Sequence, residues 1–341
     1  MKFGPVPLHQ AEGKILGHHI AGPDGLRAYR KGKPLTAVDV AGLRELGRGS
    51  VYVAELEIGD VAEDHAAGRI SRAIRGNELE LSKPQVGRVN IRARRFGVLR
   101  VEIERLTQLN DCEGITVATL AAGSVVHPGD TVATVKVIPF SVPEVRLRQV
   151  EAICQNGGAL ICVQALATRK VSLILSGSVH TRQRVLDSFL APLKKRVEAL
   201  GSEIRAVDFV PLEDELGEEH LAETLRKEVG DGSELIILAG ETAIMDRYDI
   251  TPRAVERAGG RIVCFGAPVD PGNLLMLAYL GDVPILGAPG CARSPKTNVV
   301  DWVLPRLLAG EPLSRADIVS LGHGGLLEDT PLRPMPRNHQ S

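Results

Sequence analysis

The sequence is poor in aromatic residues and has no clustered cysteines. Aromatic side chains make up 3% of the 341 residues, which argues against a stacking platform for single-stranded nucleic acid. The cysteine count is five, an odd number, and the chain has no Cys-x-x-Cys motif or Cys/His cluster. The widely spaced cysteines therefore predict neither a disulfide framework nor a structural zinc site.

Two further absences concern excess charge and long apolar runs. The chain has 41 basic and 42 acidic side chains, so it lacks the basic excess that general nucleic-acid binding requires. No segment approaches the roughly 18 uncharged apolar residues of a membrane span. The first residues, Met1 to Pro5, contain no apolar signal-peptide core. We therefore expect a cytoplasmic protein that binds neither nucleic acid nor membrane.

Glycine, proline and aliphatic residues, by contrast, are abundant and arranged in blocks. The chain has 36 glycines, 21 prolines and 44% hydrophobic residues, a composition typical of α/β layers joined by short turns. At roughly 100–200 residues per domain, the length predicts two or three domains. Changes of pattern indicate a small α/β segment at 1–76, a β-rich domain at 77–168, an α/β domain at 169–312 and a tail at 313–341.

The first segment shows signals for helix starts and one strand. Thr36–Asp39 has the pattern of a capping box, which predicts a helix start. Residues 50–54 alternate like a strand, and Asp60–Glu63 would cap a second helix that ends at Gly76. We therefore expect small helices around a short strand.

The β-rich domain alternates between apolar and polar side chains. Residues 89–93 and 101–104 both alternate, with a turn at Phe96–Gly97 between them. This pattern predicts a hairpin with one buried face. The β pattern continues in two strands and a turn, at 115–120, 131–138 and His127–Asp130.

Basic residues cluster in two places. Arginines stand at positions 88, 92, 94, 95 and 100. They could contact phosphates or an acidic partner, but an alternating sheet has a solvated face for such residues, and we favour that interpretation. Lys194, Lys195 and Arg196 form the second cluster, which we interpret as the surface of a helix.

From residue 169, apolar strands alternate with helical patterns. The strand patterns are 171–175, 204–210, 234–239, 261–265 and 283–286. The helical patterns are 185–200, with Pro192 at a kink or restart, and then 218–229, 252–258, 271–280 and 295–308. Continuous apolar strands alternating with helices predict a doubly wound, mainly parallel sheet. We therefore expect a three-layer α/β/α domain here.

Three of these helices should begin with a capping residue followed by proline, at Thr251-Pro252, Asp270-Pro271 and Ser294-Pro295. The loop before the last start contains Pro289, Gly290, Cys291, Arg293 and Ser294, and Lys296 follows. A glycine turn, a helix N-terminus and two cations would form a cradle for a phosphate group. An ordinary turn between strand and helix has the same pattern, and the sequence leaves both interpretations open. Because no histidine stands near Cys291, we assign it contact rather than nucleophilic attack.

Two other strand ends carry candidate residues. Ser176–Gly177 ends the first strand of the domain and could supply backbone donors. The turn at Gly240–Glu241 leads to Asp246 and Asp249. Two carboxylates beside a glycine turn could hold Mg²⁺ near phosphates. The alternative is that both aspartates form turns before a cap at Thr251.

Four motifs occur together in one known family. Leu286–Cys291, Ala239–Gly240, Asp249–Pro252 and Pro211–Asp214 correspond to its Leu-Pro-Gly-Asn-Pro loop, Gly-Gly turn, Asp-x-Thr-Pro helix start and Pro-Asp-Asp/Glu segment. With these motifs, residues 171–310 resemble the molybdopterin-binding domain shared by molybdopterin adenylyltransferase and molybdopterin molybdenumtransferase.

Motifs outside that domain extend the resemblance. Lys31–Leu46 resembles the Gly-x-x-Leu-Thr-x-x-Asp stretch of the molybdenumtransferase. Thr131–Val142 and Pro268–Asn273 look like a subgroup that is often joined to a molybdenum cofactor nucleotidyltransferase domain. A separate nucleotidyltransferase of this kind is therefore an expected partner, and we also expect a homo-oligomer.

The resemblance implies a ligand and roles for individual residues. It implies that molybdopterin, or its nucleotide-linked form, is bound with Mg²⁺ nearby. Asp214 and Asp249 would be catalytic, and Asp246 with Asp249 would hold the metal. The contacts to the cofactor would come from Ser176, Gly177, Gly240, Glu241, Thr251, Pro289, Gly290, Cys291, Arg293, Ser294 and Lys296.

The chain also departs from the family pattern. Ala239 replaces a glycine and would disfavour the positive φ that a Gly-Gly turn allows. Two residues are inserted before Asp249, and Cys291–Ala292 replaces Asn-Pro. Because transfer chemistry tolerates little displacement, we expect a binding or carrier protein of molybdenum cofactor biosynthesis. The alternatives are an active adenylyl- or molybdenumtransferase that uses magnesium and nucleotide, and a generic nucleotide-binding α/β protein.

Overall fold

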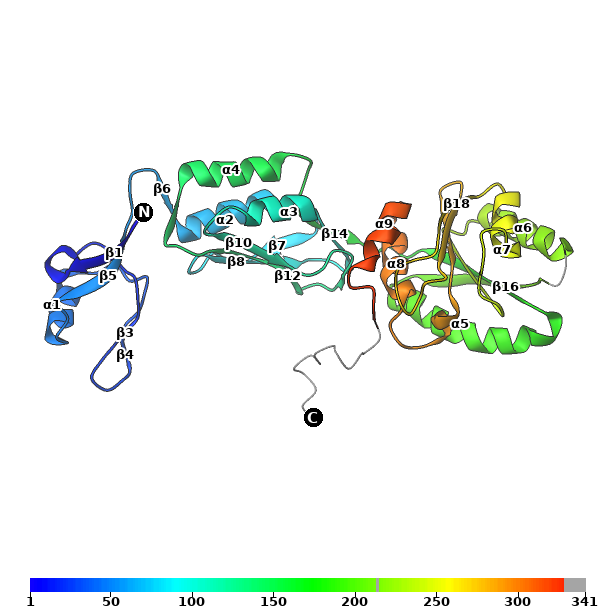
Figure 1. Cartoon of the computed structure of the whole chain (residues 1–341), viewed down its shortest axis with the longest axis horizontal. Coiled ribbons are helices and arrows are strands. Elements are labelled where there is room, and N and C mark those ends of the chain that lie inside the picture. Colours follow the sequence, from blue (N-terminus) through cyan, green and yellow to red (C-terminus); the bar gives the residue numbers. More distant parts are fainter. Residues whose placement is uncertain (213–214, 328–341) are drawn as a thin grey trace. The chain divides into compact units, whose positions relative to one another are not determined.

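A computed structural model of the chain describes residues 1–212 and 215–327 and divides the protein into two compact units, Met1–Gln164 and Ala165–Ser341 (Figure 1). Each unit has its own buried core. The mixture of helices and strands, with a mainly parallel sheet in the second unit, confirms the predicted α/β class.

Unit 1 begins with a small antiparallel sheet and one helix. Its strands, in spatial order, are β1 (Lys2–Pro7), β5 (Ser50–Glu55) and β2 (Ile15–Leu16), and β3 (Ile20–Ala21) pairs with β4 (Arg27–Tyr29). Helix α1 (Ala37–Glu45) follows the predicted capping box, in which Thr36 Oγ1 accepts from the Asp39 N–H and the Asp39 carboxylate accepts from the Thr36 N–H. Leu16, Leu43 and Val53 are buried in the core of this part. Here the sequence predicted a single strand, because the other four are short or interrupted by glycine and proline.

The second part of unit 1 is an antiparallel sheet covered on one face by helices (Figure 1). The sheet order is β10 (Ile115–Thr119), β12 (Thr131–Val137), β8 (Arg88–Ala93) and β7 (Leu79–Leu81). Helix α2 (Glu63–Ile74) packs on β8 and β12, α3 (Ile103–Asn110) packs on β10, and α4 (Glu144–Gln155) contacts both helices. Short pairings complete the part, with β11 (Val125–Val126), β9 (Gly97–Val101) and β14 (Ile161–Ala165) in one sheet and β13 (Ser141–Pro143) with β6 (Asp60–Ala62) in another.

Two predictions for unit 1 are wrong. β8 and β9 belong to different sheets, and residues from Ile103 onward form helix α3, so the expected hairpin does not exist. The apolar–polar alternation after Val101 is only four residues long, whereas buried Leu109 and half-buried Leu106 continue at helical spacing. Asp60 lies in strand β6 and does not cap α2, which begins at Glu63.

Unit 2 is built on a six-stranded sheet. Four strands are parallel neighbours, in the order β16 (Glu203–Pro211), β15 (Lys170–Gly177), β17 (Leu235–Gly240) and β20 (Val283–Gly287). β19 (Met276–Leu280) runs antiparallel between β20 and β18 (Arg261–Phe265). The long apolar strands and the parallel core agree with the prediction.

Helices cover both faces of this sheet. α6 (Glu215–Gly230) and α7 (Ile250–Arg257) share a buried cluster with Ile174 and Ile236. α5 (Arg182–Ala199) packs on β15 and β16 and buries Val185, Phe189 and Leu193. Figure 1 shows α5 on the side of the sheet opposite α6 and α7. Among its described residues, unit 2 also contains α8 (Val299–Leu308), α9 (Arg315–Val319) and the short 3₁₀ turns η2 (Val179–Thr181), η3 (Gly290–Arg293) and η4 (Ser320–Gly322), whereas the 3₁₀ turn η1 (Leu8–Gln10) belongs to unit 1.

Two predicted helix starts in unit 2 are wrong. The Asp270–Pro271 peptide bond is cis, and the chain continues through a loop into strand β19 instead of a helix. A short apolar run such as residues 276–280 is compatible with either a helix or a strand. In the structure it is a strand, because it pairs with both β18 and β20. Helix α8 begins at Val299 rather than Pro295, because Asn298 and Asp301 form a capping box there. α5 is a single helix that contains Pro192.

Candidate functional site

Three loops leave the same edge of the parallel sheet. Ser176 of β15 is in register with Gly240 of β17, and Leu238 of β17 is in register with Gly287 of β20. The loops that follow therefore start side by side at the carboxyl edge, where open α/β sheets bind ligands. A small pocket between them has a volume of about 10 Å³ and is lined by Ser176, Gly240, Thr242, Thr251 and Ala288, among others. The fold thus brings three of the predicted contact residues, Ser176, Gly240 and Thr251, to one place.

Glu241 ties two of these loops together. Its backbone N–H donates to Ser176 O over 2.8 Å. Its carboxylate accepts from the Ser178 N–H (3.1 Å), the Thr181 hydroxyl (2.5 Å) and the Arg184 guanidinium (2.5 Å). The bonds from Thr181, then from Ser178, and the charge of Arg184 lower the pKa of Glu241. A carboxylate therefore sits at the start of α5, where helix N–H groups favour a negative charge.

The glycines at this edge are required by close contacts between strands. A Cβ added at Gly240 would lie 2.6 Å from Ser176 Oγ, although Gly240 does not have a positive φ. Gly177 is similarly crowded by Thr181 and Glu241. Ala239 lies inside strand β17, so the expected strain from a positive φ at this position does not arise. This corrects the argument that Ala239 by itself disturbs the turn.

The third loop forms the 3₁₀ turn η3, with Pro289 before it and Ser294 after it. Arg293 is exposed, its Nε donates to Gly290 O over 2.9 Å, and its guanidinium lies over the Phe189 ring at 5.4 Å from the centroid. Cys291 is half-buried, and burial raises the pKa of its thiol. The thiol is therefore protonated at neutral pH, which is the opposite of the activation that a helix N-terminus would give.

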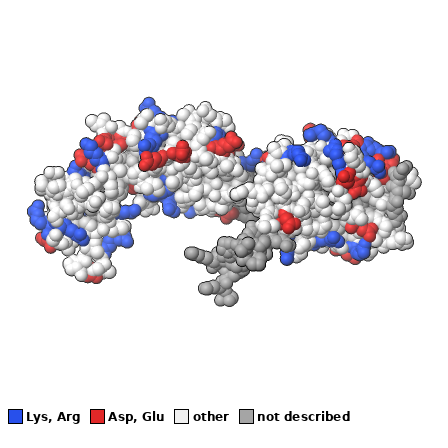
Figure 2. Space-filling model, in the orientation of Figure 1, with Lys and Arg blue, Asp and Glu red and all other residues white. Residues whose placement is uncertain are grey.

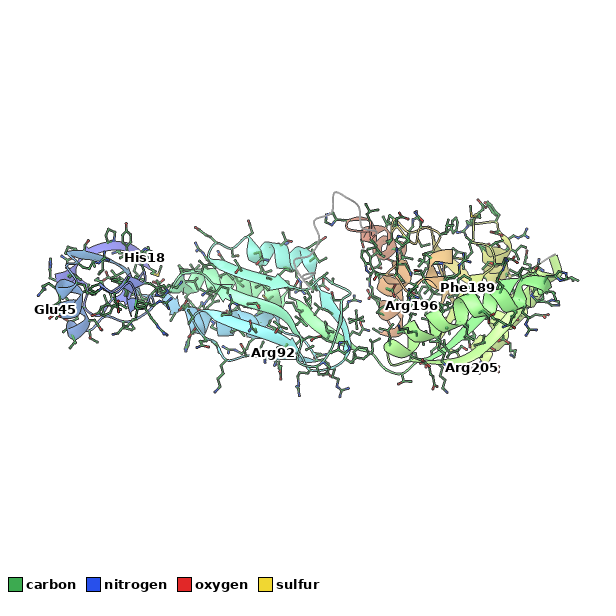
Figure 3. All side chains as sticks on the ribbon, turned by 90° about the horizontal axis from the view of Figure 1, so that it is seen from below. His18, Glu45, Arg92, Phe189, Arg196 and Arg205 are labelled. Atoms are coloured by element: carbon green, nitrogen blue, oxygen red, sulfur yellow. The ribbon has the colours of Figure 1, made fainter. Side chains whose placement is uncertain are left out.

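Arg196 supports the third loop of the candidate site, although its place in a basic cluster predicted the exposed surface of a helix. Its side chain is 10% exposed and reaches from α5 to the third loop (Figure 3). The guanidinium donates to Asp301 Oδ1 over 2.8 Å and to the carbonyl oxygens of Ala292, Ser294 and Lys296 over 3.0, 2.8 and 3.2 Å. Arg196 follows buried Phe189 by seven residues and buried Leu193 by three, so it lies next to the buried side of α5. This helical spacing is the sequence signal that could have identified its role.

The carboxylates of the two predicted metal ligands accept backbone hydrogen bonds near the start of α7. Asp249 caps α7, with one carboxylate oxygen accepting from the Ile250 N–H and the other from the Met245 N–H. Asp246 accepts from the Tyr248 N–H over 2.7 Å. Thr251 lies within the helix, so the predicted cap was displaced by two residues.

Within residues 1–212 and 215–327, no group of three or more His, Cys, Asp or Glu side chains could hold a metal ion. Asp214, predicted to be catalytic, lies outside the described residues. In the same part of the chain, no helix combines the length and apolarity that crossing a membrane requires.

Comparison with known proteins gives one partial family match and several distant structural ones. A family model described as a domain of unknown function, DUF8806, matches residues 5–55. No curated protein matches the chain.

Among solved structures, the molybdopterin biosynthesis MoeA protein from Pyrococcus horikosii is 14% identical, with 91% of this chain and 75% of that chain covered and a TM-score of 0.31. A molybdenum cofactor biosynthesis protein from Pyrococcus furiosus is 14% identical. The match covers 94% of this chain and 65% of that chain, with a TM-score of 0.24. The molybdopterin biosynthesis Mog protein from Mycobacterium ulcerans is 16% identical. The match covers 40% of this chain and 92% of that chain, with a TM-score of 0.26. All three TM-scores are below 0.5, so these matches do not assign a function to this chain.

Proposed function

We propose that unit 2 binds molybdopterin, or its nucleotide-linked form, and that the protein acts as a binding or carrier protein in molybdenum cofactor biosynthesis. The observation that carries the proposal is the convergence of three loops, after β15, β17 and β20, at one sheet edge. The loops after β17 and β20 carry the motifs on which the sequence resemblance rests.

The exposed cations suit the phosphate end of such a ligand. Arg293 and Lys296 are exposed, and no carboxylate within the described residues forms an ion pair with either side chain. A guanidinium offers several N–H donors in a planar fork that matches phosphate. Because Arg196 fixes the backbone of residues 292–296, this loop is held in place before a ligand arrives.

Binding is favoured over group transfer because the two aspartates are engaged elsewhere. Both carboxylate oxygens of Asp249 accept backbone hydrogen bonds at the start of α7. Asp246 is exposed and forms a turn with Tyr248. A transferase role is therefore the alternative outcome of the test.

The test is to incubate the purified full-length protein with molybdopterin, with and without magnesium and ATP, and to measure retained ligand and adenylylated product. Retention without product is expected. Arg293→Ala should weaken binding by about 1.5–3 kcal/mol, and Arg293→Lys should restore part of it.

Arg261→Ala is the matched control, because Arg261 begins β18 at the opposite edge of the sheet and is exposed. Failure of the wild-type protein to retain molybdopterin would overturn the proposal. Magnesium-dependent product that disappears in Asp249→Asn would replace the carrier function with that of a transferase.

A further inference from the structure

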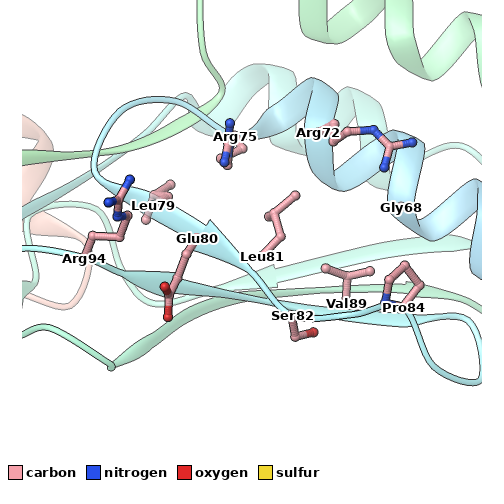
Figure 4. A pocket seen from close by; sticks show the side chains of 10 residues that line it. All are labelled: Gly68, Arg72, Arg75, Leu79, Glu80, Leu81, Ser82, Pro84, Val89 and Arg94. Carbon is pink, nitrogen blue, oxygen red and sulfur yellow. The ribbon is translucent and has the colours of Figure 1, made fainter.

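Unit 1 contains a cavity that plays no part in the proposed function of unit 2. It has a volume of about 400 Å³ and lies between α2 and the strands β7 and β8. Figure 4 shows its arginines, Arg72, Arg75 and Arg94, which come from α2, from the residue after α2 and from the residue after β8. Small-molecule sites commonly fall between about 300 and 1,000 Å³, so the cavity is large enough for a small ligand.

The three arginines lack protein partners. Within the described residues, no side chain forms an ion pair or hydrogen bond with the guanidinium of Arg72, Arg75 or Arg94. Some neighbouring arginines are paired, since Arg69 of the same helix bonds Glu144 and Glu151. Others, such as exposed Arg92 on β8, have no side-chain partner within the described residues. The pocket arginines, which are also exposed, differ from Arg92 because all three line one concavity.

The residues that line the pocket have a net charge of about +2. Glu80 is the one acidic residue in its lining, against three arginines. Like charges around a shared concavity repel each other, and low-dielectric walls strengthen their field at the centre. A dianion placed between them would remove this repulsion.

The floor of the pocket is apolar. Leu79 and Val89 are only 2% and 1% exposed and lie beneath it, whereas half-buried Leu81 and exposed Pro84 present its accessible apolar surface. Leu79 and Leu81 project from β7 toward α2 (Figure 4). A free inorganic ion would leave this surface uncovered, whereas an organic ligand with an apolar body would bury it.

We propose that this pocket binds a small organic phosphate monoester. A phosphate monoester carries about 1.5–2 negative charges at neutral pH, which matches the excess of the arginines over Glu80. Guanidinium groups bind phosphate oxygens in pairs, so Arg72, Arg75 and Arg94 hold the phosphate. The apolar body of the ligand lies on Leu81 and Pro84.

The experiment titrates the full-length protein with phenyl phosphate as the probe, by calorimetry, and compares inorganic phosphate and phenol. Phenyl phosphate should bind more tightly than either. Arg72→Gln, Arg75→Gln and Arg94→Gln should each weaken its binding about tenfold or more, as expected for a lost charge-assisted hydrogen bond.

Two controls separate this site from general charge effects and from unit 2. Arg92→Gln removes the same charge from an exposed position on β8 (Figure 3) that does not line the pocket, and should leave binding unchanged. Arg261→Gln in unit 2 should also leave phenyl phosphate binding unchanged, because exposed Arg261 lines neither this pocket nor the candidate site.

Several results would overturn the proposal. Equal binding of inorganic phosphate would show that the apolar floor plays no part, and absence of binding at millimolar concentration would show that there is no such site. Equal weakening by Arg92→Gln would indicate a general charge effect. Loss confined to Arg293→Ala would place the binding in unit 2.

Discussion

At the scale of single residues, Arg196 is the main link between α5 and the third loop of the candidate site. Its guanidinium bonds one carboxylate and three backbone carbonyls of the loop, and its side chain is 10% exposed. Removing it would leave these acceptors without their donor, and breaking a buried charged network is costly. We predict that Arg196→Met lowers the free energy of unfolding of unit 2 by about 2–4 kcal/mol.

The single tryptophan of the chain, Trp302 in α8, makes this prediction measurable. Urea unfolding followed by tryptophan fluorescence reports on unit 2, because no tryptophan lies in unit 1. Lys195→Met is the matched control, since Lys195 is exposed on the same helix and should change stability by less than about 0.5 kcal/mol. Equal effects of the two substitutions would contradict the role of Arg196.

At the scale of elements, the start of α7 distinguishes the two aspartates that were predicted to hold a metal ion. Asp249 caps α7, whereas Asp246 bonds only within the preceding turn. We predict that Asp249→Ala destabilises unit 2 by about 1 kcal/mol and that Asp246→Ala costs less than half as much. Trp302 fluorescence in urea distinguishes the two. A larger loss at Asp246 would show that this carboxylate has a role beyond the turn.

The cap of α1 should make this helix sensitive to acid. Hydrogen bonds from Lys33, and then from the Thr36 backbone and side chain, lower the pKa of Asp39 to about 2 from 3.8. Because the folded-state pKa is lowered, the stabilisation is fully present above about pH 3.8 and is lost as the pH falls through about 2.

Hydrogen exchange within residues 37–45 tests this prediction. Asp39→Asn should raise exchange relative to wild type near neutral pH, and the difference should shrink as the pH falls through about 2. Glu45→Gln, at the other end of α1, is the control and should have no such pH dependence. A difference that persists at the lowest pH would rule out the ionised cap as the cause.

At the scale of the whole molecule, each unit carries its own core and a mixed surface charge. Acidic and basic side chains are interspersed on the face visible in Figure 2, in agreement with a formal net charge of −1. A surface of this kind gives no large field of one sign. Local groups, such as the pocket arginines, must therefore provide any attraction for anions.

Separate cores predict separate folding. Residues 165–341, expressed alone, should fold, and the urea midpoint of Trp302 should match that of the full-length chain. A folded fragment with a shifted midpoint, or an unfolded one, would show that unit 1 stabilises unit 2. Circular dichroism of both proteins provides the control for helix content.

The sequence by itself determined the class of fold and the location of the loops. Strands such as Val171–Leu175 are continuously apolar because both of their faces are covered, and this pattern is visible without a structure. Once the strands are taken as parallel, their carboxyl ends must meet at one edge. The placement of Ser176 and Gly240 together followed from this rule.

Only the tertiary structure decided the identity of short elements and the partners of charged side chains. Residues 276–280 became a strand because two neighbours offered hydrogen-bond partners, and local pattern cannot report such partners. Arg196 looked like a surface residue because its acceptors lie about 100 positions further along the chain. The arginine pocket joins Arg72 and Arg75 to Arg94 through the packing of α2 on β8. Contacts between distant segments depend on how elements pack, and a linear sequence does not display that.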